Sequence, residues 1–391
     1  MRADVLVVGA GLAGLWTAAE LARRGHDVVL ADRRTRLDAS VRTTGIFVRR
    51  TLEDFDLPPE HLGPPVRRMV LYPPSHRHPV TLDSPHDEFR VGDMAPLYLT
   101  LAARAAVAGV RLELGTRYLG RRGGTHLLDG QGGPLEVRAT FAVGADGARS
   151  AVARELGLDR NRELLVGAEE VYAVPPREVV PAFHCVLDPR LAPGYLAWVL
   201  DDGRHAHVGV AGYADRYPRG LRDALRDFAA SAPGLDGVPR PDDAGRVERR
   251  GGLIPVGGLL RRIAAPDGLL VGDAAGAVSP LTAGGLDPCL RLSAHAADVL
   301  DQALRAGDRR LLARYDGAAL RARFRGRLTM RRGLSLVRTP AAASAGVALL
   351  RTPPGRAAAR RILFGHGSFP DPRPARGTAA AATLATPGAP G

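Results

Sequence analysis

The chain has 391 residues, and with 45 % hydrophobic residues it is long enough to bury the cores of two domains. Its net charge is +13, but all 54 basic residues are arginine and only 5 % of the residues are aromatic, which indicates a coding bias rather than a nucleic-acid-binding surface. No run of about 18 apolar residues occurs, so we expect no membrane-spanning segment.

The first predicted elements are typical of a dinucleotide site. A buried strand is predicted at residues 5–8, and a Gly-x-Gly-x-x-Gly pattern follows at residues 9–14. The first glycine allows a tight turn, the second lets a pyrophosphate approach the backbone, and the third lets the next helix pack on the strand. We expect that helix at residues 12–24, and a second strand at residues 28–31 that ends at Asp32. An acid at this position is suited to bind a ribose hydroxyl.

Two later segments favour FAD over NAD. Residues 144–150 read Gly-Ala-Asp-Gly-Ala-Arg-Ser, and residues 269–271 are predicted as a buried strand that ends at Gly272 and Asp273. An acid at the carboxyl end of a parallel strand points into the ligand crevice, where it is suited to accept hydrogen bonds from a ribityl chain. A long helix is predicted next, and its free amides near residues 284–286 would face the N1/O2 edge of a flavin.

These segments resemble the flavoprotein superfamily of aromatic hydroxylases, lycopene cyclases and geranylgeranyl reductases. Residues 144–150, with Arg154 downstream, are similar to its Asp-Gly motif. Residues 271–280, together with residues 194–198 and 207–210, are most similar to the geranylgeranyl reductase branch. The resemblance covers residues 1 to about 310 and implies FAD as cofactor, with NAD(P)H as a transient electron donor, because the chain has no second nicotinamide-binding motif.

The chain also departs from that branch. Residues 42–46, Arg-Thr-Thr-Gly-Ile, stand where the branch has a cysteine and paired glycines, and residues 283–285 replace Gly-Glu-Gly. Two residues instead of one separate Tyr195 from Trp198, and Met94 stands near a position where many relatives have arginine. Because the chain has no lysine, it lacks the active-site lysine that flavin-dependent halogenases need.

The motifs and the resemblance together predict the cofactor-binding residues. They are Gly9, Ala10, Gly11, Leu12, Ala13, Gly14, Asp32, Arg33, Arg42, Thr43, Asp146, Gly147, Gly272, Asp273, Pro280, Gly284, Gly285 and Leu286. Arg42 follows the Asp32 loop and is expected either to neutralise the pyrophosphate or to reach the flavin edge.

The sequence does not identify the catalytic group. Tyr195 and Trp198 would either line a substrate cavity or pack in a sheet. Cys289 is a third candidate, and either Cys289 or Asp287 would be placed to donate a proton. The simpler interpretation of Cys289 is a buried thiol, and that of Asp287 is an acid that stabilises the N-terminus of a helix. Cys185 and Cys289 show no disulfide or metal spacing, which together with an N-terminus that enters its first strand by residue 5 favours a reducing cytoplasm.

Two histidine pairs invite a metal-site interpretation. His76 and His78, and likewise His205 and His207, are spaced to share one face of a strand. No carboxylate or third ligand accompanies either pair, so we interpret them as surface or sheet histidines and expect no metal site.

The predicted fold class is α/β. It comprises a Rossmann-like FAD domain of the glutathione-reductase type, an inserted, mostly antiparallel substrate domain, and C-terminal helices. In order, the proposed parts are residues 1–65, 92–160 and 262–310 for the FAD domain, 66–91 and 161–261 for the substrate domain, 311–371 for the helical region, and 372–391 for a disordered tail.

The leading functional hypothesis is an FAD-dependent reductase of carbon–carbon double bonds in a prenyl, terpenoid or polyene substrate. Three alternatives stay open: a monooxygenase that acts through a flavin hydroperoxide, a non-redox cyclase, and a prenyl-binding escort without catalysis. The expected partner is a hydrophobic small molecule, with peripheral contact to a membrane. The oligomeric state is not indicated by the sequence.

Overall fold

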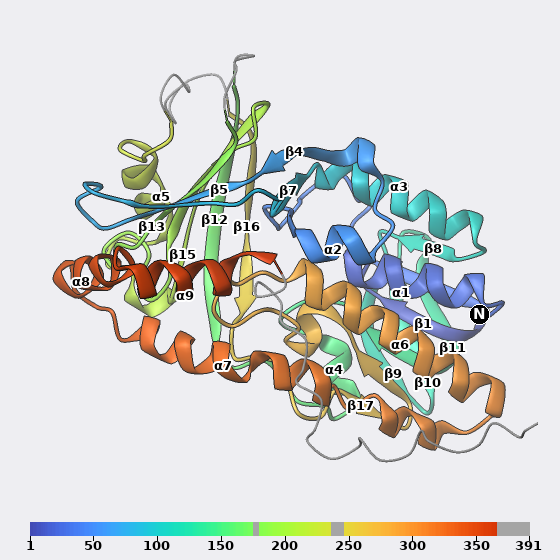
Figure 1. The fold of residues 1–391 in the computed structure, drawn as a ribbon. Coiled ribbons are helices and arrows are strands. Elements are labelled where there is room, and N and C mark those ends of the chain that lie inside the picture. Colours follow the sequence, from blue (N-terminus) through green and yellow to red (C-terminus); the bar gives the residue numbers. More distant parts are fainter. Residues whose placement is uncertain (175–179, 236–245, 366–391) are drawn as a thin grey trace, which may run out of the picture.

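The computed structural model describes residues 1–174, 180–235 and 246–365. Two large sheets stand beside one another, and the C-terminal helices extend from one to the other (Figure 1). The predicted α/β fold class is confirmed, whereas the predicted tail at 372–391 lies outside the described residues.

The first sheet contains the dinucleotide motif. Its five central strands are mutually parallel, in the order β18, β11, β1, β2 and β8. The strands of the sheet are β1 (Arg2–Val8), β2 (Val28–Asp32), β8 (Arg111–Leu114), β9 (Arg117–Arg122), β10 (Thr125–Gly130), β11 (Gly133–Gly144), β17 (Ala264–Ala265) and β18 (Gly268–Leu270). The carboxyl ends of β1, β11 and β18 meet at one edge, which brings the three sequence motifs together.

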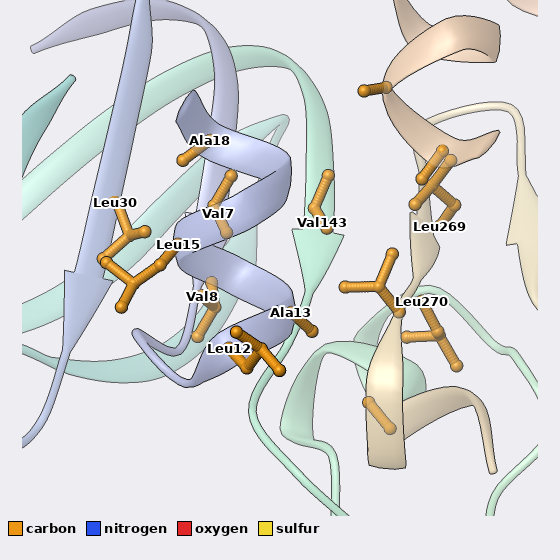
Figure 2. Close-up of a cluster of buried hydrophobic side chains, with 14 of the residues drawn as sticks. Val7, Val8, Leu12, Ala13, Leu15, Ala18, Leu30, Val143, Leu269 and Leu270 are labelled. Atoms are coloured by element: carbon orange, nitrogen blue, oxygen red, sulfur yellow. The ribbon is translucent and has the colours of Figure 1, made fainter. Parts of the chain in front are cut away.

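Three helices cover one face of this sheet. Helix α1 (Leu12–Arg23) lies between α3 (Met94–Val107) and α6 (Leu286–Ala306) (Figure 1). Figure 2 shows Leu15 and Ala18 of α1 against the side chains of the strands. Leu15 is 1 % exposed and Ala18 fully buried, because the apolar residues of α1 recur at helical spacing. The short α4 (Ala151–Glu155) follows the Asp-Gly motif.

The second sheet has seven strands, and only β13 and β5 are paired in parallel among its described strands. Their order is β16 (Arg246–Pro255), β12 (Leu164–Ala173), β15 (His205–Gly212), β14 (Ala197–Asp201), β13 (Ala182–Val186), β5 (Arg68–Tyr72) and β6 (Val80–Asp83). Helix α5 (Leu221–Ala229) covers one face, where Val199 and Val208 pack with Phe228. Side chains of alternate residues, such as Trp198, point to the other face.

Smaller elements connect the two sheets. The third sheet has the order β3 (Ile46–Val48), β7 (Phe89–Gly92) and β4 (Leu62–Val66), and α2 (Arg49–Asp54) follows β3. The 3-10 turns are η1 (Pro59–His61), η2 (Ala214–Arg216), η3 (Gly272–Ala275) and η4 (Arg309–Arg314).

Three α-helices form the described part of the C-terminal region, which was predicted to be helical. They are α7 (Ala318–Ser335), α8 (Pro340–Leu350) and α9 (Pro353–Leu363). Pro340 and Pro353 begin helices, and the hydroxyls of Thr339 and Thr352 accept hydrogen bonds from backbone amides as N-caps. Within the part of the chain that the structure describes, no helix is both long and apolar enough to span a membrane.

Two helix starts follow from the local sequence. Helix α5 begins at Leu221, because Pro218 and Gly220 interrupt the chain before it. Helix α3 begins at Met94, whose side chain is fully buried.

Candidate active site

The glycine turn after β1 leaves open space before the first turn of α1. A Cβ atom at Gly14 would lie 1.8 Å from the carbonyl oxygen of Gly9, and Gly9 has a φ of +107°, so both positions require glycine. At Gly11 a Cβ would meet no described atom within 4 Å, and no described side chain caps the helix. The free amides of this helix terminus therefore face open space, an arrangement suited to a phosphate.

Asp32 lies at the end of β2, beside the glycine turn. Its Oδ2 accepts a 2.6 Å hydrogen bond from the Ala10 amide, and the Arg34 guanidinium donates to both carboxylate oxygens. Burial opposes ionisation of Asp32, but these hydrogen bonds outweigh it and lower its pKa. Arg33, which was predicted to bind the cofactor, is exposed, whereas the neighbouring Arg34, which was not predicted, contacts Asp32.

The Asp-Gly motif contributes a partly satisfied carboxylate. Asp146 Oδ2 accepts hydrogen bonds from the amides of Ala151 and Val152, at 2.6 Å and 3.3 Å. Its Oδ1 is buried and has no hydrogen-bond partner within the described part of the chain. A buried oxygen of this kind is costly unless a donor satisfies it, so the site fits a bound group that brings hydroxyls or ordered water.

The turn after β18 approaches α1 closely. At Gly272, where φ is +57°, a Cβ would lie 2.9 Å from the Cβ of Ala13. Asp273 follows and lines a cavity, and burial raises its pKa to about 6. No described side chain caps α6, which begins at Leu286, so its N-terminal amides are also available to a ligand.

One cavity, of about 660 Å³, connects this crevice with the second sheet. Eleven of the predicted cofactor-binding residues line it: Gly11, Leu12, Ala13, Arg42, Thr43, Gly147, Gly272, Asp273, Gly284, Gly285 and Leu286. Seven others lie outside its lining: Gly9, Ala10, Gly14, Asp32, Arg33, Asp146 and Pro280. Arg42 is exposed and forms no ion pair with the described residues.

The other end of the cavity is apolar. Its wall comes from the second and third sheets and from the C-terminal helices, with the apolar side chains Met69, Leu71, Phe89, Phe183, Met330, Leu334, Leu350, Ile362 and Leu363. A space of this size and polarity accepts a flexible hydrocarbon chain next to a dinucleotide.

A row of opposed residues crosses the cavity-facing side of the second sheet. Arg250, Glu169, Gly209, Trp198 and Cys185 are paired in this order across five strands. A Cβ at Gly209 would lie 2.2 Å from Cζ2 of Trp198, so the absence of a side chain lets the indole lie over β15. The indole Nε1 thereby reaches Glu169 Oε2, at 3.0 Å.

Glu169 is the centre of a buried polar network on the cavity wall. The Thr44 hydroxyl and the Trp198 indole donate to its Oε2, while Nδ1 of His207 and Nη1 of Arg250 lie 3.3 Å and 3.4 Å from its Oε1. Arg250 also donates to the carbonyl oxygen of Thr44, at 3.3 Å. The network therefore holds the loop at residues 42–46 against the second sheet.

The network keeps His207 protonated. Burial alone would lower its pKa, but the carboxylates of Asp202 and Glu169 outweigh burial and raise the pKa to about 9. Burial likewise opposes ionisation of Glu169, and the nearby cations His207 and Arg250 nevertheless hold its pKa below the usual range. At neutral pH the cavity wall thus contains an imidazolium between two carboxylates.

The predicted catalytic candidates have separate surroundings. The Tyr195 hydroxyl donates a 2.5 Å hydrogen bond to the carbonyl oxygen of Thr282, and Trp198 contacts Glu169 as described. Burial raises the pKa of Cys289, so its thiol is neutral. All three residues line the cavity. Asp287, in contrast, is paired with Arg291 and accepts a hydrogen bond from Thr51.

The histidine pairs differ from one another. His76 and His78 have positive φ angles in the turn between β5 and β6, so they do not share a strand face. His207 is a sheet histidine, but it is 3 % exposed and belongs to the network. Among the described residues there is no group of three or more side chains that could hold a metal ion. The sequence analysis missed Glu169 and Arg250, since only their registers in the sheet bring them together with His207.

Comparison with known proteins identifies the class to which this fold and site belong. Residues 4–72 match the family model described as FAD dependent oxidoreductase. The described residues fit FAD, because the open helix terminus at Gly11 and the unsatisfied oxygen of Asp146 lie where a dinucleotide would bind. The protein is an FAD-dependent oxidoreductase.

Two curated relatives define the family. The chain is 32 % identical over 323 residues to digeranylgeranylglycerophospholipid reductase 1 of Methanopyrus kandleri, which covers 79 % of this chain and 83 % of that protein. It is 32 % identical to the menaquinone reductase of Mycolicibacterium smegmatis, over 76 % of each chain. The chain belongs to the geranylgeranyl reductase family, as its motifs predicted.

A solved structure supports the fold. A geranylgeranyl bacteriochlorophyll reductase-like protein from Thermoplasma acidophilum superimposes with a TM-score of 0.81, over 93 % of this chain and 96 % of that chain, at 21 % identity. This likeness extends over nearly the whole of both chains and supports the overall fold.

Proposed function

We propose that the protein reduces carbon–carbon double bonds in the prenyl chain of a lipid. The observation that carries this proposal is the cavity of about 660 Å³, polar where the dinucleotide motifs meet and apolar beneath the C-terminal helices. Bound FAD supplies hydride transfer there, and the apolar wall holds the hydrocarbon and excludes water. We propose NAD(P)H as the transient electron donor.

The substrate test uses two lipids that the names of the relatives suggest. Purified holoenzyme is incubated anaerobically with NADPH and either digeranylgeranylglycerophospholipid or menaquinone, and the product is analysed by mass spectrometry. A gain of two hydrogen atoms per double bond supports the reductase. A gain of one oxygen atom, dependent on O₂, would instead show the monooxygenase. An isomer of unchanged mass would show the cyclase, and binding without turnover would show the escort.

We propose that the residues predicted from the sequence bind FAD, with Arg34 in place of the exposed Arg33 and with Asp273 on the ribityl chain. Asp273→Ala should therefore lose most bound FAD, measured by quenching of flavin fluorescence in a titration of the apoprotein. Asp287→Ala is the matched control on the next element, because that carboxylate is paired with Arg291 rather than facing the crevice. An unchanged FAD affinity in Asp273→Ala would contradict the assigned role.

We further propose peripheral contact with the cytoplasmic face of a membrane, through α7–α9. Arginine is the only charged residue type between residues 317 and 365. Leu336 and Leu349 are 72 % and 67 % exposed in the same region, which also lines the cavity. The protein should co-sediment with phosphatidylglycerol vesicles and not with phosphatidylcholine vesicles, and the binding should weaken with salt. Equal recovery with both vesicle types would contradict an electrostatic contact.

A further inference from the structure

The proton that the reduction requires has no assigned source among the predicted catalytic candidates. Burial raises the pKa of Cys289, and burial likewise raises the pKa of Tyr195, whose hydroxyl is already bonded to Thr282. Both groups are therefore weak acids. Trp198 donates its indole hydrogen to Glu169 and is not an acid in this pH range.

The network on the second sheet has the properties that those candidates lack. Glu169 lines the cavity, and its side chain is only 4 % exposed. His207 lies behind it, with Nδ1 3.3 Å from Glu169 Oε1 and Nε2 3.9 Å from Oδ2 of Asp202. Asp202 follows β14 in the turn that precedes β15, so the three side chains form a line from that turn to the cavity.

The charges around this line favour a stored proton. Three carboxylates, of Asp202, Glu169 and Glu248, surround two cations, His207 and Arg250. Arg250 is shared between Glu248 and Glu169, whereas His207 is the cation that lies beside both Glu169 and Asp202. Deprotonation of His207 would leave Glu169 and Asp202 facing a neutral ring in a buried site, at a large electrostatic cost. The proton stored on His207 is thus separated from the cavity only by Glu169.

We propose that Glu169 is the catalytic residue that protonates the substrate, and that His207 supplies the proton to it. This inference rests on the proposed function. The π bond of the substrate breaks: bound FAD would supply the hydride to one carbon, and the other carbon gains a proton from the Glu169 carboxyl. His207 Nδ1 transfers its proton to Glu169 in the same step, and His207 is then reprotonated from solvent through Asp202. The two electrons would come from NAD(P)H, the proposed donor.

The different acidities of Glu169 and His207 explain their separate roles as proton donor and proton store. A carboxyl whose pKa is held low is a strong acid whenever it carries a proton, whereas the imidazolium keeps that proton available at neutral pH. Thr44 and Trp198 both donate to Glu169 Oε2 and fix the orientation of the carboxylate toward the cavity. They are positioning residues in this mechanism.

The decisive variant is Glu169→Gln, with Glu170→Gln as the matched control. Glu170 is the next residue of β12 and points to the opposite face, where it contacts Arg249. Single-turnover reduction of digeranylgeranylglycerophospholipid or menaquinone by prereduced holoenzyme should slow by about 100-fold or more in Glu169→Gln. The control should stay near the wild-type rate, and both variants should keep wild-type FAD affinity by fluorescence titration. A wild-type rate in Glu169→Gln would overturn the proposal.

A pH profile separates proton supply from a structural role. The groups that face His207 are Glu169 of β12, Asp202 before β15, His205 of β15 itself, and Arg250 of β16. The rate of substrate reduction by the wild type should be constant below the pKa of His207 and should fall as the pH rises through about 9. In His207→Gln the rate should be low, and this alkaline limb, the fall at high pH, should be absent. Persistence of the limb in His207→Gln would overturn the proposal even if Glu169→Gln does not fold.

A measurement without turnover checks the stored proton. The NMR signals of the His207 ring are assigned by their loss in His207→Gln. They should titrate near pH 9 in the substrate-free protein, and at lower pH in Glu169→Gln. A neutral His207 ring at pH 7 would overturn the proposal. If the wild type reduces neither lipid, the proposed function fails and the relay fails with it; if the wild type reduces one and Glu169→Gln matches its rate, only the relay fails.

Discussion

The two ends of the cavity are built in different ways. At the crevice end, three short segments meet because they follow β1, β11 and β18, which are neighbours in one parallel sheet. At the sheet end, the row from Arg250 to Cys185 consists of one residue from each of several strands. The register of each strand decides which of its residues lies in the row. The comparison teaches that backbone requirements leave contiguous motifs in a sequence, whereas a wall made of opposed side chains does not.

The sharpest test of the crevice end is a pair of glycine substitutions. Gly14→Ala places a Cβ 1.8 Å from a carbonyl oxygen and should cost more than about 3 kcal/mol of unfolding free energy, because backbone must move. Gly11→Ala meets open space, so the fold should survive while FAD affinity falls. Urea unfolding and FAD titration measure the two effects. An unchanged FAD affinity in Gly11→Ala would show that the open space is not a ligand site.

The free energy of unfolding should depend on pH because of His207, at the sheet end of the cavity. Its pKa is about 9 in the folded protein, against an ordinary value of 6.5. The charged form therefore contributes stability that is fully present below about pH 6.5 and is lost as the pH rises through 9, by up to about 3 kcal/mol. Urea unfolding of the apoprotein across this range measures the loss. His207→Gln should make the free energy of unfolding less dependent on pH. An unchanged slope of free energy against pH in that variant would show that other groups cause the pH dependence.

A smaller effect is expected at the glycine over which the indole lies. Gly209→Ala would place a Cβ 2.2 Å from the Trp198 ring and should cost about 2 kcal/mol while it displaces the indole from Glu169. Trp198 fluorescence and thermal unfolding report the two consequences, with Trp16→Phe used to remove the signal of the other tryptophan. An unperturbed emission spectrum would show that the indole does not depend on this gap.

The smallest effect is expected at Tyr195. Tyr195→Phe removes the hydrogen bond to the Thr282 carbonyl oxygen but keeps the ring on the cavity wall, at a cost of about 1 kcal/mol. Since the hydroxyl holds the turn before α6, FAD affinity should weaken slightly and the rate of substrate reduction should change little. A large rate loss with intact FAD affinity would restore Tyr195 as the proton donor in place of Glu169.

Much of the fold was predictable because its signals are local. The glycine pattern, the acid at the end of β2, and the long helix α6 all appear in the structure close to their predicted bounds. The effect of the prolines depends on their position: Pro340 and Pro353 stand at the first residue of a helix, whereas Pro218 precedes α5 and delays its start. The domain bounds drawn from the sequence stay a prediction.

The candidate site was predictable only in part. Arg33 and Arg34 are adjacent and chemically identical, so the choice between them depends on which side chain turns back to Asp32. His207 was interpreted as an ordinary sheet histidine because its partners are 38 and 5 residues away in the chain. A buried charge is revealed by its neighbours in space, and the sequence does not name them.

By itself, the sequence predicted a dinucleotide site at three glycine-containing turns, and the resemblance of those turns indicated the FAD-dependent family to which the chain belongs. The reason is that close backbone approach and positive φ angles allow few residues other than glycine. Only the tertiary structure decided what lines the cavity beside those turns: apolar side chains beneath the C-terminal helices and a carboxylate backed by an imidazolium. Those features arise from strand register and burial, which change the acidity of Glu169 and His207 without changing the residues themselves.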